Sequence, residues 1–111
     1  MGIVELTASN FENYVIQNEE PMIVDFYATW CGPCKMMAPV LEEFARENET
    51  CRIGKVDIDQ YPELAEEFHV MSVPTFMLFR DGKPETRVSG MMKKKELQKW
   101  MEWISITENK R

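Results

Sequence analysis

Hydrophobic residues recur along the chain with two spacings, one typical of buried strands and one typical of helices. An almost unbroken apolar run from Met22 to Ala28 predicts a central strand that is covered on both faces. Residues 3–6 and 52–58 predict two further strands. A segment with helical spacing follows each of them, so this part of the chain predicts three strand-helix pairs with parallel strands.

Each of these helices is predicted from the face on which its apolar residues gather. Thr7 or Ser9 is expected to cap the first helix and Asp59 the third, while the second contains Pro39 and ends at about Glu49. The apolar positions of the three helices are Phe11, Tyr14 and Val15; Met37, Val40, Leu41, Phe44 and Ala45; and Tyr61, Leu64, Ala65 and Phe68.

The pattern changes in the last third of the chain. Residues 75–80 and 85–89 predict two short strands joined by a tight turn over residues 81–84, which favours an antiparallel hairpin. A final helix is predicted from Lys93 to about Thr107. The whole chain, residues 1–111, is therefore expected to form a single α/β domain with a mixed sheet and helices on both faces.

Composition removes several function classes. The chain has 13 Lys and Arg against 19 Asp and Glu, and this net charge of −6 disfavours binding to nucleic acid or anionic membranes. No apolar run is long enough to span a bilayer. Residues 1–6 lack the pattern of a secretory signal, so a cytoplasmic location is expected.

Chemistry is suggested first by Cys31 and Cys34, which are separated by Gly32 and Pro33 and preceded by Trp30. Two thiols this close can form and reopen a disulfide and so carry two electrons. A structural disulfide and half of a zinc site are the alternatives. A zinc site would need further ligands at a suitable spacing, and the remaining Cys51 and His69 do not provide it.

Asp25 interrupts the apolar run of the predicted central strand. A carboxyl group at such a position is costly unless it is paired or its pKa rises. Asp25 is therefore predicted to be either a satisfied core residue or a group with a chemical role.

At this point the chain resembles the thioredoxin family over essentially its whole length. The motifs that carry the resemblance are the segment from Val24 to Lys35, Ala38-Pro39, Lys55-Val56-Asp57, Val73-Pro74-Thr75, Asp81-Gly82 and Gly90. The resemblance implies the thioredoxin fold, a central five-stranded mixed sheet flanked by four helices in the order β-α-β-α-β-α-β-β-α. It also implies thiol-disulfide exchange as the chemistry, and therefore a general protein disulfide reductase.

The resemblance assigns roles to the residues at the cysteine pair. Cys31 would be the exposed attacking thiol, favoured as a thiolate by the helix that follows it, and Cys34 would be the resolving thiol. Asp25 would lie buried behind Cys34 and help to take its proton, with Lys55 of the neighbouring strand as its partner.

The same resemblance implies a docking surface for clients. The Val73-Pro74 peptide bond is expected to be cis and to face the cysteines, and Val73 would pair with an extended client segment that Gly90 allows to approach. The expected apolar patch consists of Trp30, Gly32, Pro33, Val73, Pro74, Gly90 and Met91. Of the Met91-Met92 pair, one methionine could instead be a core residue and the other solvent-facing.

Electrons are expected to come from another protein. The chain has no Gly-x-Gly-x-x-Gly motif and no metal site is predicted, so electrons from NADPH or ferredoxin would arrive through a separate thioredoxin reductase. Disulfide-containing clients are the other expected partners, and a monomer is expected. A binding module with incidental thiols, and an oxidant or isomerase, remain as alternative functions.

Overall fold

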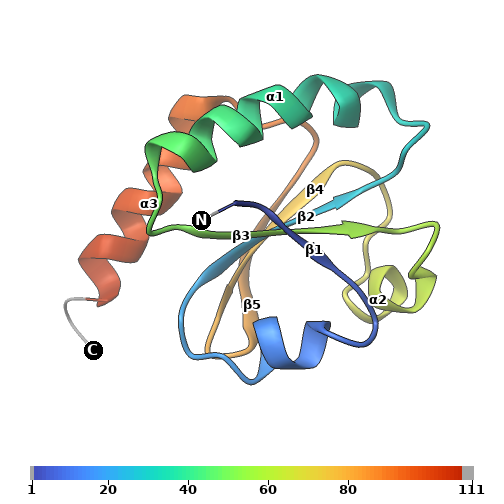
Figure 1. The fold of residues 1–111 in the computed structure, drawn as a ribbon, viewed down its shortest axis with the longest axis horizontal. Coiled ribbons are helices and arrows are strands. Elements are labelled where there is room, and N and C mark those ends of the chain that lie inside the picture. The colour runs from blue at the N-terminus through green and yellow to red at the C-terminus, as the bar shows by residue number, and fades with distance from the viewer. Residues whose placement is uncertain (1, 109–111) are drawn as a thin grey trace.

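Five strands form one mixed sheet through the middle of the molecule, shown in Figure 1 for a computed structural model that describes residues 2–108. The strands lie in the order β1-β3-β2-β4-β5. Their bounds are β1 Val4–Leu6, β2 Met22–Tyr27, β3 Arg52–Asp57, β4 Thr75–Arg80 and β5 Lys83–Ser89. The first three strands are parallel to one another, whereas β4 is antiparallel to both of its neighbours, β2 and β5. The predicted fold class is thereby confirmed.

Four helices of the described residues cover the two faces of this sheet (Figure 1). They are η1 Glu12–Ile16, α1 Gly32–Glu47, α2 Pro62–Glu67 and α3 Lys94–Glu108. Apolar residues of α1 and α3 pack with Ile23, Ile53 and Phe76 on one face, and those of η1 and α2 pack with Val24 and Phe26 on the other. Residues of β2 thus alternate between two separate cores, as expected for a strand buried on both sides.

The first helix differs from the prediction in shape. It is a single π-helical segment in which the Gln17 N–H donates to the Glu12 carbonyl at 2.8 Å. Because a π turn is wider than an α turn, Tyr14 falls off the apolar face on which Phe11 and Val15 lie buried, and it is 44% exposed. The side chain of Thr7 does not cap this helix but accepts the Asn10 N–H in the turn before it.

The hairpin turn is shorter than the predicted turn over residues 81–84. Strand β5 already begins at Lys83, so only Asp81 and Gly82 connect the strands, with positive φ angles of 53° and 76°. Two left-handed residues are the conformation that twisted antiparallel strands favour in a two-residue turn.

Gly82 is also in close contact with the end of η1, which gives a stability prediction. Gly82→Ala should lower the free energy of unfolding by about 2 kcal/mol or more, because the new Cβ would meet a strained φ and overlap the Ile16 carbonyl oxygen. Urea denaturation measures this loss. Gly2→Ala is the control, because a Cβ at that site meets no atom within 4 Å; equal stability of the two variants would contradict the prediction.

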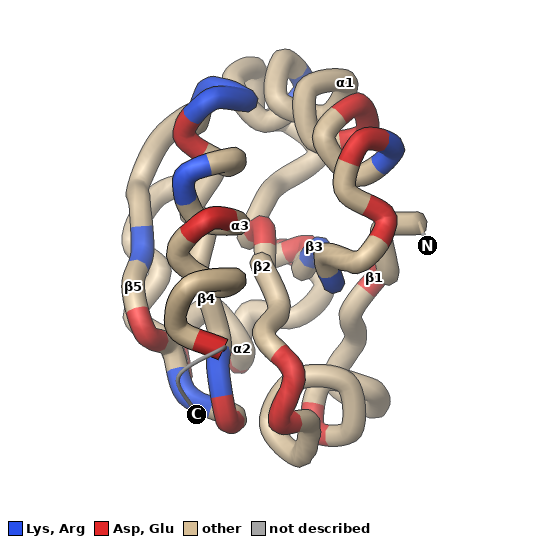
Figure 2. The backbone as a smooth tube through the Cα atoms, turned by 90° about the vertical axis from the view of Figure 1, so that its left-hand side faces the viewer, with Lys and Arg blue, Asp and Glu red and all other residues tan. Residues whose placement is uncertain are grey.

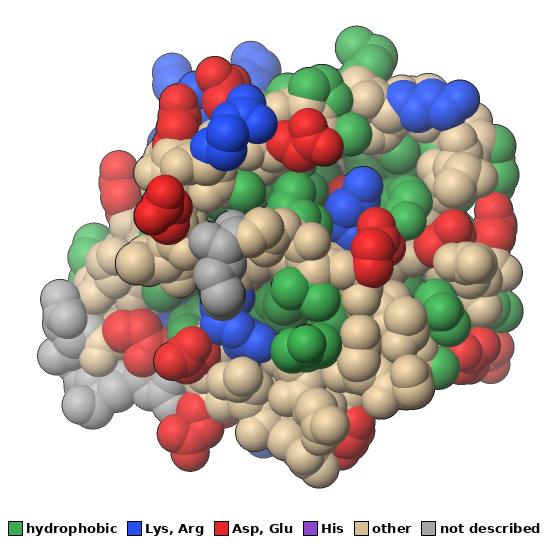
Figure 3. Space-filling model, viewed as in Figure 1, with side chains coloured by type: hydrophobic (Ala, Val, Ile, Leu, Met, Phe, Trp, Pro, Cys, Tyr) green, Lys and Arg blue, Asp and Glu red, His purple; other side chains and the backbone are tan. Residues whose placement is uncertain are grey.

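Charged positions are dispersed over the molecule. Lys and Arg positions are interspersed with Asp and Glu positions along the backbone in Figure 2, and on the face shown in Figure 3 hydrophobic side chains lie between charged ones. Within residues 2–108, no helix is long and apolar enough to cross a membrane.

Candidate active site

The two cysteines lie where β2 ends and α1 begins. Cys31 is the N-cap of α1 in an extended conformation, and Gly32 and Pro33 form the first turn of the helix. Cys31 and Cys34 are joined in a disulfide, and the Cys34 N–H donates to the Cys31 sulfur at 3.2 Å. The positive end of a 16-residue helix is therefore directed at Cys31, which favours negative charge on its sulfur.

Cys31 was expected to be exposed, and in the disulfide form this expectation is wrong. Its residue is only 4% exposed, against 7% for Cys34. The cause is packing, because the two cysteines and Ala28 form a small cluster against Tyr27, Ile58 and Val73. In the disulfide form Cys31 is therefore packed among neighbouring side chains rather than open to solvent.

The predicted cis peptide bond between Val73 and Pro74 is confirmed. The Cys31 sulfur lies 3.6 Å from the Val73 carbonyl oxygen, and the Gly90 N–H donates to the Pro74 carbonyl at 2.7 Å. Gly90 has a φ of 102°, in the range that glycine adopts without strain. Val73, Pro74 and Gly90 are thus connected to one another and adjoin the disulfide.

The surface around the site differs in part from the predicted apolar patch. Trp30, Gly32, Pro33 and Met91 are exposed as expected, whereas Pro74 is buried directly before the packed strand β4. Of the methionine pair, Met92 lies in the core, whereas Met91 is 44% exposed. Sequence analysis missed two exposed methionines, Met36 and Met71, which are 63% and 92% exposed and lie close in sequence to Cys34 and Val73.

The orientation of Trp30 is set by a residue that had been given another role. The Trp30 Nε1–H donates to the Asp59 carboxylate at 2.8 Å, although Asp59 had been predicted to cap α2. That prediction is wrong because α2 begins only at Pro62 and has no side-chain cap. The turn before it is instead held by the Asp57 carboxylate, which accepts the Asp59 N–H at 2.9 Å.

This contact predicts a change that nuclear magnetic resonance can detect. Asp59→Ala should shift the Trp30 Nε1–H proton signal upfield by several tenths of a ppm, because the indole loses its charged acceptor. The signal of Trp103, whose Nε1–H donates to Glu85 at 3.0 Å, should stay in place. Glu85→Ala is the matched control and should shift the Trp103 signal while leaving the Trp30 signal in place. A Trp30 signal unmoved by Asp59→Ala would contradict the assigned bond.

Asp25 lies in the middle of β2, is 2% exposed, and has one carboxyl oxygen, Oδ1, without a hydrogen-bond partner. Burial raises the pKa of this carboxyl to about 7, although the Lys55 ammonium lowers it and the Glu5 carboxylate raises it. Lys55 stands beside Asp25 in the register of β2 and β3. Its ammonium, however, lies 4.3 Å from the centre of the Tyr27 ring. A proton can therefore enter or leave Asp25 near neutral pH.

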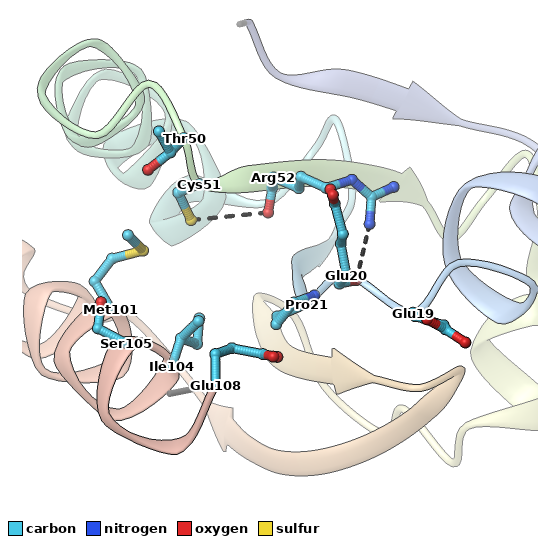
Figure 4. Close-up of a pocket in the computed structure, with 10 residues that line it drawn as sticks. All are labelled: Glu19, Glu20, Pro21, Thr50, Cys51, Arg52, Met101, Ile104, Ser105 and Glu108. Atoms are coloured by element: carbon cyan, nitrogen blue, oxygen red, sulfur yellow. Dashed lines mark hydrogen bonds between the residues drawn. The ribbon is translucent and has the colours of Figure 1, made fainter. Parts of the chain in front are cut away.

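A pocket of 690 Å³, shown in Figure 4, lies at the end of the sheet away from the Cys31–Cys34 loop. Pro21 and Cys51, which line it, directly precede β2 and β3, whereas the Cys31 loop follows the other end of β2. Cys51 is buried, and burial raises the pKa of its thiol to about 12, which disfavours the reactive thiolate. Among the described residues, no group of three or more His, Cys, Asp or Glu side chains could hold a metal ion.

Comparison with known proteins shows which family this chain resembles in sequence. A sequence model of the family described as thioredoxin matches residues 2–103. A thioredoxin of Mycobacterium tuberculosis is 49% identical over 88 residues, which are 78% of this chain and 76% of that protein. A thioredoxin of Staphylococcus saprophyticus is 46% identical over 103 residues, 92% of this chain and 97% of its own.

A third relative is a longer protein. The bifunctional thioredoxin reductase/thioredoxin of Mycobacterium leprae is 49% identical over 88 residues, which cover 78% of this chain but 19% of that protein.

The family model extends across the elements that build the site, and this chain carries a disulfide between Cys31 and Cys34 within the matched residues. The chain is accordingly a protein-disulfide oxidoreductase that works without a bound cofactor and has a reductase and disulfide-containing clients as its partners. By its sequence, its fold and its redox disulfide, the chain belongs to the thioredoxin family.

Proposed function

We propose that Cys31 attacks client disulfides and Cys34 resolves the resulting mixed disulfide. The observation that carries this order is the hydrogen bond from the Cys34 N–H to the Cys31 sulfur at the start of α1. In the first step the Cys31 thiolate forms a bond to one client sulfur, and the other client sulfur leaves as a thiolate. In the second step Cys34 loses its proton and attacks the Cys31 sulfur, which regenerates the Cys31–Cys34 disulfide and releases the second client thiolate.

Asp25 is the proton acceptor for Cys34 in this scheme, and Lys55 adjusts its acidity. Support comes from its burial beneath the α1 face, its unpaired carboxyl oxygen and its pKa of about 7. A base with a pKa near the working pH is present as carboxylate in a useful fraction of molecules and still holds a proton well.

Clients dock on the surface that surrounds the disulfide. The exposed side chain of Trp30, the loop of Gly32 and Pro33, and the exposed Met91 supply apolar contact area, and Val73 supplies backbone groups for an extended client segment. Pro74 and Gly90 support this surface, because the hydrogen bond between them joins the Val73 loop to the residue that follows β5.

The electron donor is a thioredoxin reductase, fed by NADPH or by ferredoxin, and the chain acts as a monomer in the cytoplasm. The Mycobacterium leprae relative, which carries both names in one protein, supports such a pairing of reductase and thioredoxin. Insulin reduction assayed with an NADPH-linked and with a ferredoxin-linked reductase decides between the two electron sources.

Alkylation tests the order of attack. The fully reduced protein is treated with a limiting amount of iodoacetamide at pH 7, and the modified cysteine is mapped by mass spectrometry. Cys31 should be labelled at least about tenfold faster than Cys34 or Cys51, because the helix start favours its thiolate and burial opposes that of Cys51. Preferential labelling of Cys34 would reverse the assignment.

A further inference from the structure

Three charged residues form one row across the sheet. Lys55 of β3 is aligned with Glu5 of β1 on one side and with Asp25 of β2 on the other. Aligned residues of neighbouring parallel strands present their side chains on the same face of the sheet, here the face covered by α1 and α3. The Lys55 ammonium therefore has two carboxyl groups within reach, one exposed on Glu5 and one buried on Asp25.

The Lys55 ammonium lies over the ring of Tyr27. Tyr27 follows Asp25 by two positions and lies on the same face, and the Lys55 Nζ atom sits 4.3 Å from the centre of its ring. The Tyr27 hydroxyl in turn donates to the Glu5 carboxylate, 3.3 Å from Oε2 and 3.5 Å from Oε1. Glu5 thereby anchors the ring that receives the ammonium.

The buried carboxyl is left without a close cation. In the described part of the chain, none of the ion pairs joins Lys55 to Asp25 at 4.0 Å or less, and the Asp25 Oδ1 atom has no hydrogen-bond partner. An opposite charge in direct contact would stabilise the carboxylate and lower its pKa by at least about 1 unit. The position of the ammonium thus decides whether Asp25 can be protonated near neutral pH.

We propose that Glu5 is a positioning residue for disulfide exchange: through the Tyr27 hydroxyl it holds the Tyr27 ring as a seat for the Lys55 ammonium and so keeps that ammonium from pairing with the Asp25 carboxylate. The effect of Glu5 on disulfide exchange rests on the role proposed above for Asp25 as the proton acceptor. The arrangement itself belongs to the resting protein and can be tested without turnover.

Other charges near Asp25 do not account for the same effect. The charges that act on the pKa of Asp25 are those of Lys55 and Glu5, and other titratable groups of the neighbouring elements include Tyr27 of β2, Asp57 of β3, and Cys31 and Cys34 at the start of α1. On β4 the aligned residue is the uncharged Phe76. The two cysteines do not titrate while they form a disulfide, and the Asp57 carboxylate bonds to the backbone of the turn that follows it. Of the strand carboxylates in this set, only that of Glu5 accepts the Tyr27 hydroxyl.

Two substitutions at Glu5 separate the anchoring of Tyr27 from simple charge. In Glu5→Gln the amide oxygen can still accept the hydroxyl, so only a distant negative charge is lost and the pKa of Asp25 should fall by about 0.5. In Glu5→Leu the anchor is lost as well, the ammonium is released toward Asp25, and the fall should be about 1 or more. The titration is followed in the oxidised protein by the ¹³C signal of the Asp25 carboxyl.

Glu12→Gln is the matched control, because Glu12 is an exposed residue of η1, which covers the opposite face. It should leave the Asp25 titration unchanged. Equal shifts in Glu5→Gln and Glu5→Leu would overturn the proposal, since Glu5 would then act by its charge alone. No shift in either variant would overturn it too.

A kinetic experiment keeps this inference distinct from the proposed role of Asp25. The rate of insulin reduction is measured from pH 5.5 to 8.5 for the unmodified protein, for Glu5→Leu and for Asp25→Asn. If Asp25 is the base, the midpoint of the pH profile in Glu5→Leu should move down with the ¹³C titration, and Asp25→Asn should abolish it. A shifted titration with identical rate profiles in all three proteins would refute the role of Asp25 and leave the positioning by Glu5 intact.

Discussion

Asp25→Asn should stabilise the oxidised protein, and the gain should grow by about 2 to 3 kcal/mol between pH 5 and pH 8.5. The carboxyl of Asp25 is 2% exposed and its pKa is raised from 3.8 to about 7, mainly by burial. Urea unfolding of both proteins at the two pH values, without reductant, measures the difference directly.

The direction follows from proton binding. The folded protein keeps the Asp25 proton up to pH 7 or so, whereas the unfolded chain releases it near pH 3.8. Over that interval the folded state binds more protons, so its stability declines as the pH rises, and above it the full cost of a buried carboxylate is present. Because asparagine does not ionise, the stability of Asp25→Asn does not decline with pH in this way.

Glu102→Gln provides the control, because Glu102 is exposed on α3 and its removal should change stability equally at both pH values. A constant difference between Asp25→Asn and the unmodified protein would contradict the raised pKa. It would also remove the basis for treating Asp25 as a base near neutral pH.

The order of the elements could be predicted because each segment has a clear spacing of apolar residues. The run from Met22 to Ala28 predicted a strand covered on both faces, and residues of β2 do face two cores. Spacing fails where the helix type changes, which is why Tyr14 was placed on the buried face of η1. Spacing also fails to predict helix caps. Asp57 and Asp59 both precede α2 in the sequence, and only the path of the chain after β3 shows that the Asp57 carboxylate accepts a hydrogen bond in the turn.

The candidate site could be predicted to the extent that its residues are neighbours in a motif. The Cys31–Cys34 disulfide was expected from the spacing of the two cysteines, and the cis bond before Pro74 was expected from the family resemblance. The exposure of Met36 has a signal in the sequence, because Met37 points into the core and the preceding residue of a helix lies about 100° away. The exposure of Met71 and the contact between Trp30 and Asp59 have no such signal.

Glu5 shows why part of the site cannot be read from the sequence. It lies twenty residues before Asp25 in a three-residue strand, and nothing in its own segment suggests chemistry. Only the register of β1, β3 and β2 brings Glu5, Lys55 and Asp25 into one row. Cross-strand pairs of this kind depend on strand order, which periodicity does not specify.

Cys34→Ser should convert the protein from a turning-over reductase into a trap for its clients. Cys31 can still attack a client disulfide, but the serine hydroxyl cannot resolve the mixed disulfide that forms. Catalytic insulin reduction should fall at least about 10³-fold, because an external thiol must replace a neighbour held 5.2 Å away between Cα atoms. Non-reducing electrophoresis should show covalent adducts that disappear with dithiothreitol.

Two variants serve as controls for the trap. Cys31→Ser should lose turnover without forming adducts, since it lacks the attacking sulfur. Cys51→Ser should retain full turnover, because Cys51 lies at the other end of the sheet and its thiol has a pKa of about 12. Adducts on Cys31→Ser instead of Cys34→Ser would mean that Cys34 attacks first, and the hydrogen bond from its N–H to the Cys31 sulfur would then not select the nucleophile.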